Sequence, residues 1–307
     1  MSATPVCRAC GAGPVALRGR KAGGFLRREF EFHACGACGF MHVEPFSGFA
    51  IYDDAYYRGA GPDPYVDYET EYRDWRASDR GLEFHDLARI AEAHFPATGA
   101  HPGTAAPLRW LDFGCGAGGF LKFLRARGAL AGRALELTGH DVGSYADLLR
   151  DRDGFRILGL DALAQETEAS FDVISLIEVI EHLPAPLDPL RLIARLLKPG
   201  GLLLLTTGNL ESPAARRAGL AYRYCAPEIH VSLFNPRALA ALYRRAGLEP
   251  IAVRYHGAVQ FKVVKTLRHR PAVRALARLA LRFPPLVRWI DARYGVSAMP
   301  CAVKPRR

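Results

Sequence analysis

A glycine-rich stretch, LDFGCGAGGF, has the residue types and spacing of a turn that holds a nucleotide-like ligand. Gly114, Gly116 and Gly119 fit the G-x-G-x-x-G pattern of a dinucleotide-binding turn, which serves hydride transfer. The same stretch fits the D-x-G-x-G-x-G pattern associated with S-adenosylmethionine, through Asp112, Gly114, Gly116 and Gly118. The two patterns predict different chemistry, because the second ligand donates a methyl group.

The acidic residue before the turn favours the second pattern. A dinucleotide places its pyrophosphate against the glycines and the helix N-terminus, where the carboxylate of Asp112 is unfavourable. S-adenosylmethionine has no phosphate, and its ammonium group suits an acidic neighbour. At the end of the next strand, Asp141 is placed to accept the ribose hydroxyls, with Glu136 as the alternative. Asp161 follows the third strand, where it accepts the adenine amine or caps a helix.

Four cysteines near the N-terminus form two C-x-x-C pairs with 24 residues between them, Cys7 with Cys10 and Cys35 with Cys38. Each pair places two thiolates on one tight turn, so the pattern predicts a tetrahedral zinc site in a small ribbon. Because sulfur takes all four positions, we expect the zinc to be structural. The total of seven cysteines is odd, which favours a reduced compartment over a disulfide framework.

Candidate acid and base residues follow two later strands. Glu181 and His182 lie in the stretch EVIEHL, where they either reach a second substrate or cap the next segment. Glu228 and His230 lie in a loop before a helix, where a histidine can act as a general base. A structural histidine bonded to the backbone is the alternative for His230. The expected catalytic residues are His230, Glu228 and His182.

The segments that must position these residues alternate between strands and helices from residue 108 onward, which predicts an α/β, Rossmann-like doubly wound sheet. Such a sheet binds ligands at the carboxyl ends of its strands, beside the switch in strand order, and the glycine turn lies there. Three parts are expected: a zinc-ribbon-like segment over 1–46, a helical and aromatic linker and lid over 47–107, and the main domain over 108–307.

The linker contains the stretch YDDAYYRG, which supplies Tyr52, Tyr56 and Tyr57. These tyrosines either close over a ligand as a lid or pack into the core with their hydroxyls in water. The residues that follow have helical periodicity, so we expect helices to join the ribbon to the main domain.

The net charge of +10 is concentrated at the C-terminus. Residues 257–307 hold twelve basic residues and one acidic residue, or +11, whereas the rest of the chain holds 29 basic against 30 acidic residues, or −1. A basic helical insertion is expected over 257–297, as a solvated cap, a surface for an anionic acceptor or a peripheral membrane contact. No signal sequence and no membrane-spanning apolar run are found, so we expect a cytoplasmic protein.

Three stretches taken together resemble the class I S-adenosylmethionine-dependent methyltransferases in order and spacing: LDFGCGAGGF, FDVISLIEVIEHLPAP and LLKPGGLLLLTTGN. The resemblance covers roughly residues 108–209. It implies that Ile177 and Glu178 lie along the cofactor and that a histidine at the position of His230 faces the acceptor. It also implies a C-terminal antiparallel strand, over 299–303, between the fifth and sixth strands.

Two narrower resemblances bear on the substrate. The stretch EVIEHL looks like that of ubiquinone-pathway O-methyltransferases, and the four-cysteine N-terminus is similar to that of zinc-containing sugar C-methyltransferases. The prediction is therefore O- or C-methylation of a small molecule, a sugar or natural-product intermediate. The alternatives are an RNA methyltransferase with a zinc ribbon, whose basic tail contacts phosphates, and an NAD-dependent oxidoreductase.

Overall fold

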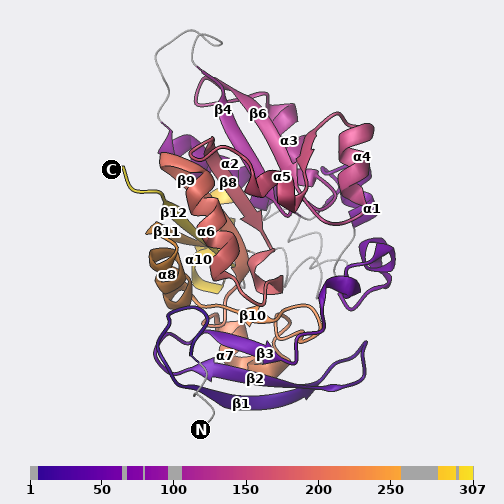
Figure 1. The fold of residues 1–307 in the computed structure, drawn as a ribbon, viewed down its shortest axis with the longest axis vertical. Helices are drawn as coiled ribbons and strands as arrows, with labels where there is room; N and C mark the ends of the chain where they lie inside the picture. The colour runs from indigo at the N-terminus through magenta and orange to yellow at the C-terminus, as the bar shows by residue number, and fades with distance from the viewer. Residues whose placement is uncertain are drawn as a thin grey trace.

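The structure of the chain, a computed structural model, describes residues 6–63, 68–78, 80–95, 106–256, 283–294 and 297–306. The strands of its main sheet are β4 (Leu108–Phe113), β5 (Ala129–Leu130), β6 (Arg133–His140), β7 (Arg156–Leu158), β8 (Phe171–Ile177), β9 (Leu197–Gly208), β11 (Glu249–His256) and β12 (Ser297–Val303). Their order is β11, β12, β9, β8, β4, β6, β5, with β7 paired to β6 (Figure 1). The strand order reverses between β4 and β8, so this is the edge where a ligand is expected.

Helices cover both faces of the sheet. They are α1 (Tyr68–Arg73), α2 (Gly81–His94), α3 (Gly119–Arg127), α4 (Tyr145–Asp151), α5 (Leu160–Ala164), α6 (Leu187–Leu196), α7 (Pro213–Ala218), α8 (Pro236–Arg245) and α10 (Pro284–Tyr294). Short turns of other helix types are η1 (Phe49–Ile51), η2 (Tyr56–Ala60), η3 (Ile180–His182) and η4 (Gly219–Ala221).

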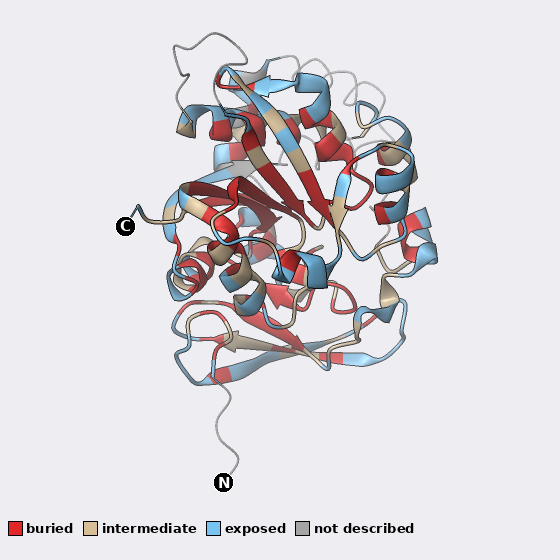
Figure 2. Cartoon of the chain, turned by 45° about the horizontal axis from the view of Figure 1, so that its top comes forward, coloured by how far each residue is buried: buried red, intermediate tan, exposed pale blue. Residues whose placement is uncertain are grey.

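Successive side chains of β9 point to opposite faces of the sheet and pack into two separate hydrophobic cores. Leu202 and Leu204 pack on the face that α2 and α3 cover, whereas Leu203 and Leu205 pack on the face that α6 and α8 cover. The central strands are buried on both sides (Figure 2). Because a fully buried leucine contributes about 1.5 to 3 kcal/mol, this double burial fixes the strands that carry the site.

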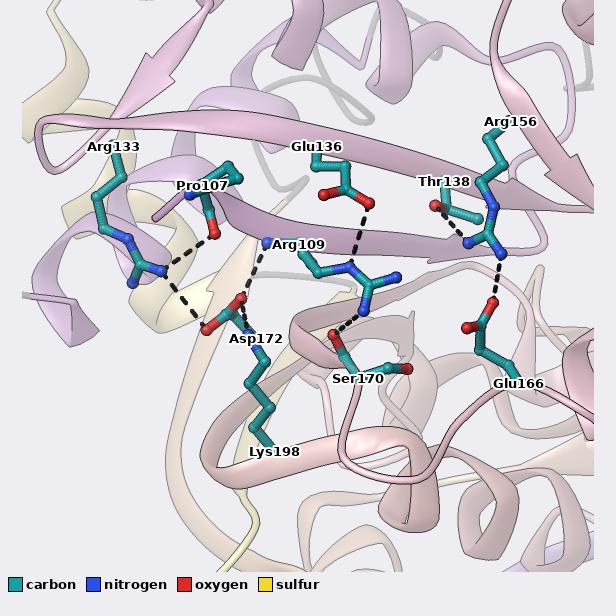
Figure 3. A network of polar contacts seen from close by, with 10 residues as sticks. All are labelled: Pro107, Arg109, Arg133, Glu136, Thr138, Arg156, Glu166, Ser170, Asp172 and Lys198. Atoms are coloured by element: carbon teal, nitrogen blue, oxygen red, sulfur yellow. Dashed lines mark hydrogen bonds and ion pairs between the residues drawn. The ribbon is translucent and has the colours of Figure 1, made fainter. Parts of the chain in front are cut away.

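Charged residues tie the strands together at the end opposite the ligand edge (Figure 3). One oxygen of Asp172 accepts hydrogen bonds from the backbone N–H of Arg109 at 2.9 Å and from Lys198 Nζ at 2.7 Å. The guanidinium of Arg109 pairs with Glu136 at 3.2 Å. Glu136, the alternative ribose ligand, therefore belongs to this network, which leaves Asp141 as the candidate.

The N-terminal segment forms a second, antiparallel sheet with strands β1 (Val15–Ala22), β2 (Glu29–Cys35), β3 (Met41–Glu44) and β10 (Ser232–Leu233). The fourth strand comes from the main domain, where β10 pairs with β3. We call β1, β2 and β3 with the two cysteine turns the ribbon. Figure 1 shows it below the main sheet, with α7 beside it. The ribbon is thus built into the main domain through a shared sheet.

The predicted α/β Rossmann-like fold with a C-terminal antiparallel strand is confirmed. Strand β12 lies between β9 and β11, antiparallel to both, and includes the predicted residues 299–303. Most of the expected insertion over 257–297, including Arg270, Arg274, Arg278 and Arg282, lies outside the described residues. Within the described ranges, every helix is too short or too polar to cross a membrane.

Candidate functional site

The glycine turn between β4 and α3 requires left-handed backbone at three positions. Gly114, Gly116 and Gly118 have φ values of +77°, +52° and +76°, which side chains rarely adopt. A Cβ on Gly116 would also lie 2.8 Å from the ring of Tyr68. These three glycines are those of the D-x-G-x-G-x-G pattern, whereas Gly119 starts the helix. The backbone geometry therefore favours the pattern associated with S-adenosylmethionine.

Asp141, directly after β6, organises this turn. Its Oδ2 accepts the N–H of Gly116 at 2.7 Å, and its Oδ1 accepts the N–H of Gly143 at 2.7 Å. The hydroxyl of Tyr57 donates to Oδ1 at 3.3 Å. The carboxylate is thus fixed at the carboxyl edge of the sheet, beside the glycine turn, where it can accept ribose hydroxyls.

Asp112 is buried beneath the turn, with 2% of its surface exposed. The hydroxyl of Ser175 on β8 donates to its Oδ1 at 2.6 Å. Burial raises the pKa of Asp112 to about 7, and the hydrogen bond from Ser175 only partly opposes this. A carboxyl group in this state gains from a nearby positive charge, which a sulfonium or an ammonium group supplies.

Arg80 lies at the same site, although no sequence pattern marks it. Its Nε lies 3.1 Å from Glu83 Oε2, and Nη1 lies 3.9 Å from Glu71 Oε2. Its other terminal nitrogen, Nη2, is buried without a hydrogen-bond partner among the described residues. The guanidinium also lowers the pKa of Asp112 through its charge. Two carboxylates therefore hold a guanidinium that has a donor left for an anion, such as an amino-acid carboxylate.

Two exposed apolar residues follow neighbouring strand ends. His140 and Leu158 are register partners at the ends of the parallel strands β6 and β7, and Val142 and Leu160 each follow two residues later. They are 78% and 55% exposed. Asp161 is exposed in the first turn of α5. Val142 and Leu160 offer apolar surface and Asp161 offers a hydrogen-bond acceptor, which are the features that an adenine ring requires.

The end of β8 places two expected cofactor residues. Ile177 is the buried last residue of the strand. Glu178 follows in left-handed backbone, φ +55°, which is strained for a non-glycine residue. The hydroxyl of Tyr224 donates to Glu178 Oε2, whereas Oε1 is buried without a partner in the described part of the chain. Strain and an unused acceptor at one residue are typical of a binding site.

Glu181, His182 and His230 come together beside this strand end. The rings of the two histidines lie 4.9 Å apart, and one ligand atom from each of the three residues lies within 4.8 Å of the others. Thr207 donates to Glu181 Oε2 at 2.8 Å. Burial, followed by the charge of Glu178, raises the pKa of Glu181 well above its usual value. The trio suits either proton transfer or the binding of a transition-metal ion.

The protonation state of His230 follows from its contacts. Its Nδ1 lies 3.0 Å from the carbonyl oxygen of Tyr224, which can only accept, so Nδ1 carries the proton and Nε2 keeps its lone pair. Burial, with a contribution from His182, holds the pKa of His230 well below its usual value. The ring is therefore neutral at physiological pH, the state that a general base needs.

Glu228, one of the expected catalytic residues, contacts the ribbon. Its Oε1 accepts the backbone N–H groups of Phe25 and Leu26, in the turn between β1 and β2. The side chain is buried against the ribbon. No sequence pattern predicts this contact, because its partners lie about 200 residues earlier in the chain.

The tyrosines of the linker are both buried and close to the site. Tyr56 and Tyr57 are 3% and 6% exposed. Tyr57 reaches Asp141, and the hydroxyl oxygen of Tyr52 lies 2.7 Å from Nδ1 of His182. The linker therefore touches both the cofactor side and the histidine side of the site.

The four cysteines of the two C-x-x-C pairs converge in one cluster. Sulfur–sulfur distances are 3.7 Å for Cys7 with Cys38 and for Cys10 with Cys35, and all four sulfurs lie within 4.8 Å of one another. A tetrahedron with Zn–S bonds of about 2.3 Å has edges of about 3.8 Å. The donor set and its spacing therefore fit a zinc ion.

Comparison with known proteins gives a consistent result. The profile of a family described as "Methyltransferase domain" matches residues 77–253. A ubiquinone biosynthesis O-methyltransferase from Xanthomonas campestris pv. campestris (strain B100) is 30% identical over 245 residues, which cover 75% of this chain and 89% of that protein. The enzyme of the same name from Paracidovorax citrulli (strain AAC00-1) is 32% identical over 167 residues, or 48% of this chain and 68% of that protein.

Among solved structures, a SAM-dependent methyltransferase from Archaeoglobus fulgidus aligns with a TM-score of 0.49 and 18% identity, over 77% of this chain and 99% of that one. The family match spans more than half of the chain, and it contains the glycine turn, Asp141 and Glu178. The chain therefore belongs to the methyltransferase-domain family and is a class I, S-adenosylmethionine-dependent methyltransferase.

Proposed function

We propose that this methyltransferase transfers the methyl group to a hydroxyl oxygen of a small molecule. Asp141 would bind the ribose, Val142 and Leu160 would flank the adenine beside Asp161, and Arg80 would bind the cofactor's carboxylate. The glycine turn, Asp112, Ile177 and Glu178 would complete the cofactor site. The observation that carries the proposal is the buried ring of His230, whose Nδ1 donates to the carbonyl of Tyr224 and which lies beside His182 after β8, where Glu178, the expected cofactor residue, also lies.

S-adenosylmethionine, when bound, supplies an electrophilic methyl group, whose S–C bond breaks as the new O–C bond forms. The chain must orient the acceptor and receive its proton. Nε2 of His230 is the proposed proton acceptor, since Nδ1 is committed to the carbonyl of Tyr224. His182 and Glu181 lie next to His230 and would pass the proton on or hold the acceptor.

The relatives favour oxygen over carbon or a nucleobase as the methylated atom, because their names specify O-methylation in ubiquinone biosynthesis. A sugar or natural-product intermediate stays the broader proposal for the acceptor. Transfer of tritium from S-[methyl-³H]adenosylmethionine to catechol, compared with aniline and total tRNA as acceptors, tests the choice. Label in the catechol product supports the proposal, and label in tRNA alone would contradict it.

Binding of the cofactor should release a proton from Asp112. The cofactor carries a net positive charge, which lowers the pKa of Asp112 from about 7, so a fraction of a proton per chain leaves at pH 7. Calorimetry in buffers of different ionisation enthalpy measures this release. Affinity should rise as the pH rises through 7, since the ionised carboxylate is the binding form. Asp112→Asn should abolish the release, whereas the exposed Asp188→Asn should keep it.

We also propose that the cysteine cluster holds one structural zinc ion. Elemental analysis should give about one zinc per chain for the unaltered protein. Cys38→Ser should lower this strongly and reduce the thermal midpoint, because a buried thiolate ligand is lost. Cys301→Ser, a buried cysteine outside the cluster, is the matched control and should keep its zinc. Equal zinc content in both variants would exclude the cluster as the site.

A further inference from the structure

The turn between β1 and β2 is hydrogen-bonded to Glu228, which lies in the same loop as His230. Glu228 Oε1 accepts the N–H of Phe25 at 2.8 Å and also the N–H of Leu26. The carboxylate packs so closely on the turn that a Cβ on Gly23 would lie 2.5 Å from Oε1. The exposed fraction of Glu228 is 6%. The contact therefore directs Oε1 of Glu228 to the turn between β1 and β2.

The loop that carries Glu228 also carries His230. The backbone N–H of His230 donates to the carbonyl of Ala226 at 2.8 Å, and its ring donates to the carbonyl of Tyr224. On the ribbon side, Lys21 Nζ donates to the carbonyl of Cys225 at 2.6 Å. The ribbon therefore forms hydrogen bonds with this loop on both sides of Ala226, at Cys225 and at Glu228.

The same loop continues into a backbone ladder that joins the ribbon to η3. The N–H of Val43 on β3 donates to the carbonyl of Val231 at 3.0 Å, and the N–H of Val231 donates to the carbonyl of Glu181 at 2.8 Å. The hydroxyl of Ser232 donates to the carbonyl of Leu183 at 2.7 Å. His230 precedes this ladder by one residue, so its backbone is fixed between the ribbon and the segment that carries His182.

We propose that Glu228 is a positioning residue that uses the ribbon turn to set the place of the His230 ring. The inference rests on the proposed role of His230 as the proton acceptor. Glu228 acts through its oxygen as a hydrogen-bond acceptor and transfers no proton itself. The ribbon is then part of the acceptor side of the enzyme, in addition to being a zinc module.

Two pairs of variants test this proposal. Glu228→Gln keeps an oxygen that can accept both N–H groups, whereas Glu228→Ala removes it. Gly23→Ala pushes on the carboxylate and on the fully buried ring of Phe30, whereas a Cβ on Gly24 meets nothing within 4 Å. Glu228→Ala and Gly23→Ala should therefore displace the loop, and Glu228→Gln and Gly24→Ala should not.

The readout is the pair of ring ¹⁵N signals of His230 in protein labelled with [¹⁵N]histidine, assigned from their loss in His230→Gln. They should shift or broaden in Glu228→Ala and Gly23→Ala and stay unchanged in the other two variants. With catechol as the probe acceptor, kcat should fall roughly 10- to 100-fold in the two displaced variants, while the Kd of S-adenosylmethionine stays within about twofold. Thermal unfolding confirms that each variant is folded.

Two outcomes would overturn the proposal. Unmoved His230 signals in all four variants would show that the turn does not position the ring. A Glu228→Gln variant as inactive as Glu228→Ala, with His230 signals unmoved, would make Glu228 a proton carrier. Failure of the proposed role of His230 is distinguishable, because His230→Gln would then retain activity while the ring signals still moved in Glu228→Ala and Gly23→Ala.

Discussion

His230→Gln is expected to reduce kcat by about 100-fold or more, at the lower end of what a general base contributes. Glutamine is uncharged and polar like the neutral ring, but it has no basic nitrogen to accept the proton of a hydroxyl. The Kd of S-adenosylmethionine should stay within about twofold, because among the described residues the ring contacts His182 and the carbonyl of Tyr224, not the glycine turn. Steady-state kinetics with catechol and calorimetry with the cofactor measure the two effects.

The pH dependence of the same reaction provides a second check. Because burial holds the pKa of His230 well below its usual value, the ring stays unprotonated as the pH falls from 8 to 6. The contribution of His230 to kcat should therefore be constant over this range. His85→Gln, which changes an exposed histidine on α2, is the matched control and should leave kcat unaltered. A His230→Gln variant with the kcat of the unaltered enzyme would remove His230 from the mechanism.

Asp141→Ala should weaken cofactor binding by about 100-fold or more. Two ribose hydroxyls would each lose a charge-assisted hydrogen bond, worth about 1.5 to 3 kcal/mol. The N–H groups of Gly116 and Gly143 also lose their acceptor, so the glycine turn loosens in the same variant. Calorimetric titration with S-adenosylmethionine measures the affinity.

The control for this prediction is Asp147→Ala, on the exposed surface of α4, which should bind the cofactor with unaltered affinity. Asp141→Asn should fall between the two, because an amide oxygen still accepts hydrogen bonds without the charge. An Asp141→Ala variant with an affinity within about threefold of the unaltered protein would contradict the assignment of Asp141 to the ribose.

Local patterns were sufficient to predict where those residues of the candidate site lie that belong to one strand end or one turn. The left-handed glycines, Asp141 and the cysteine pairs each depend on a few neighbouring residues, so their spacing is visible in the sequence. The position of β12 depends on long-range topology, and it was predicted only because the class I resemblance implies it. Asp112 was placed correctly beside the turn, but its pKa depends on burial, which no spacing reveals.

The contacts that the sequence did not reveal join distant segments. Arg80 reaches the site because Glu71 and Glu83 hold it beside Asp112, and nothing in the stretch RASDRG marks this arginine. Glu228 was expected to be a catalytic residue, but its carboxylate accepts the N–H groups of Phe25 and Leu26 in the ribbon. Such roles are decided by how separate segments pack against each other, so they require a structure.

Hydrogen–deuterium exchange with and without saturating S-adenosylhomocysteine tests most directly that the cofactor is held where β4, β6 and β8 end. Bound product should slow exchange in peptides covering 112–119, 141–145 and 177–182, because their amides lie at this edge of the sheet. Exchange in β1, on the far side of the ribbon, should be unchanged. Protection confined to other segments, with none in the three strand-end peptides, would contradict the cofactor site described here.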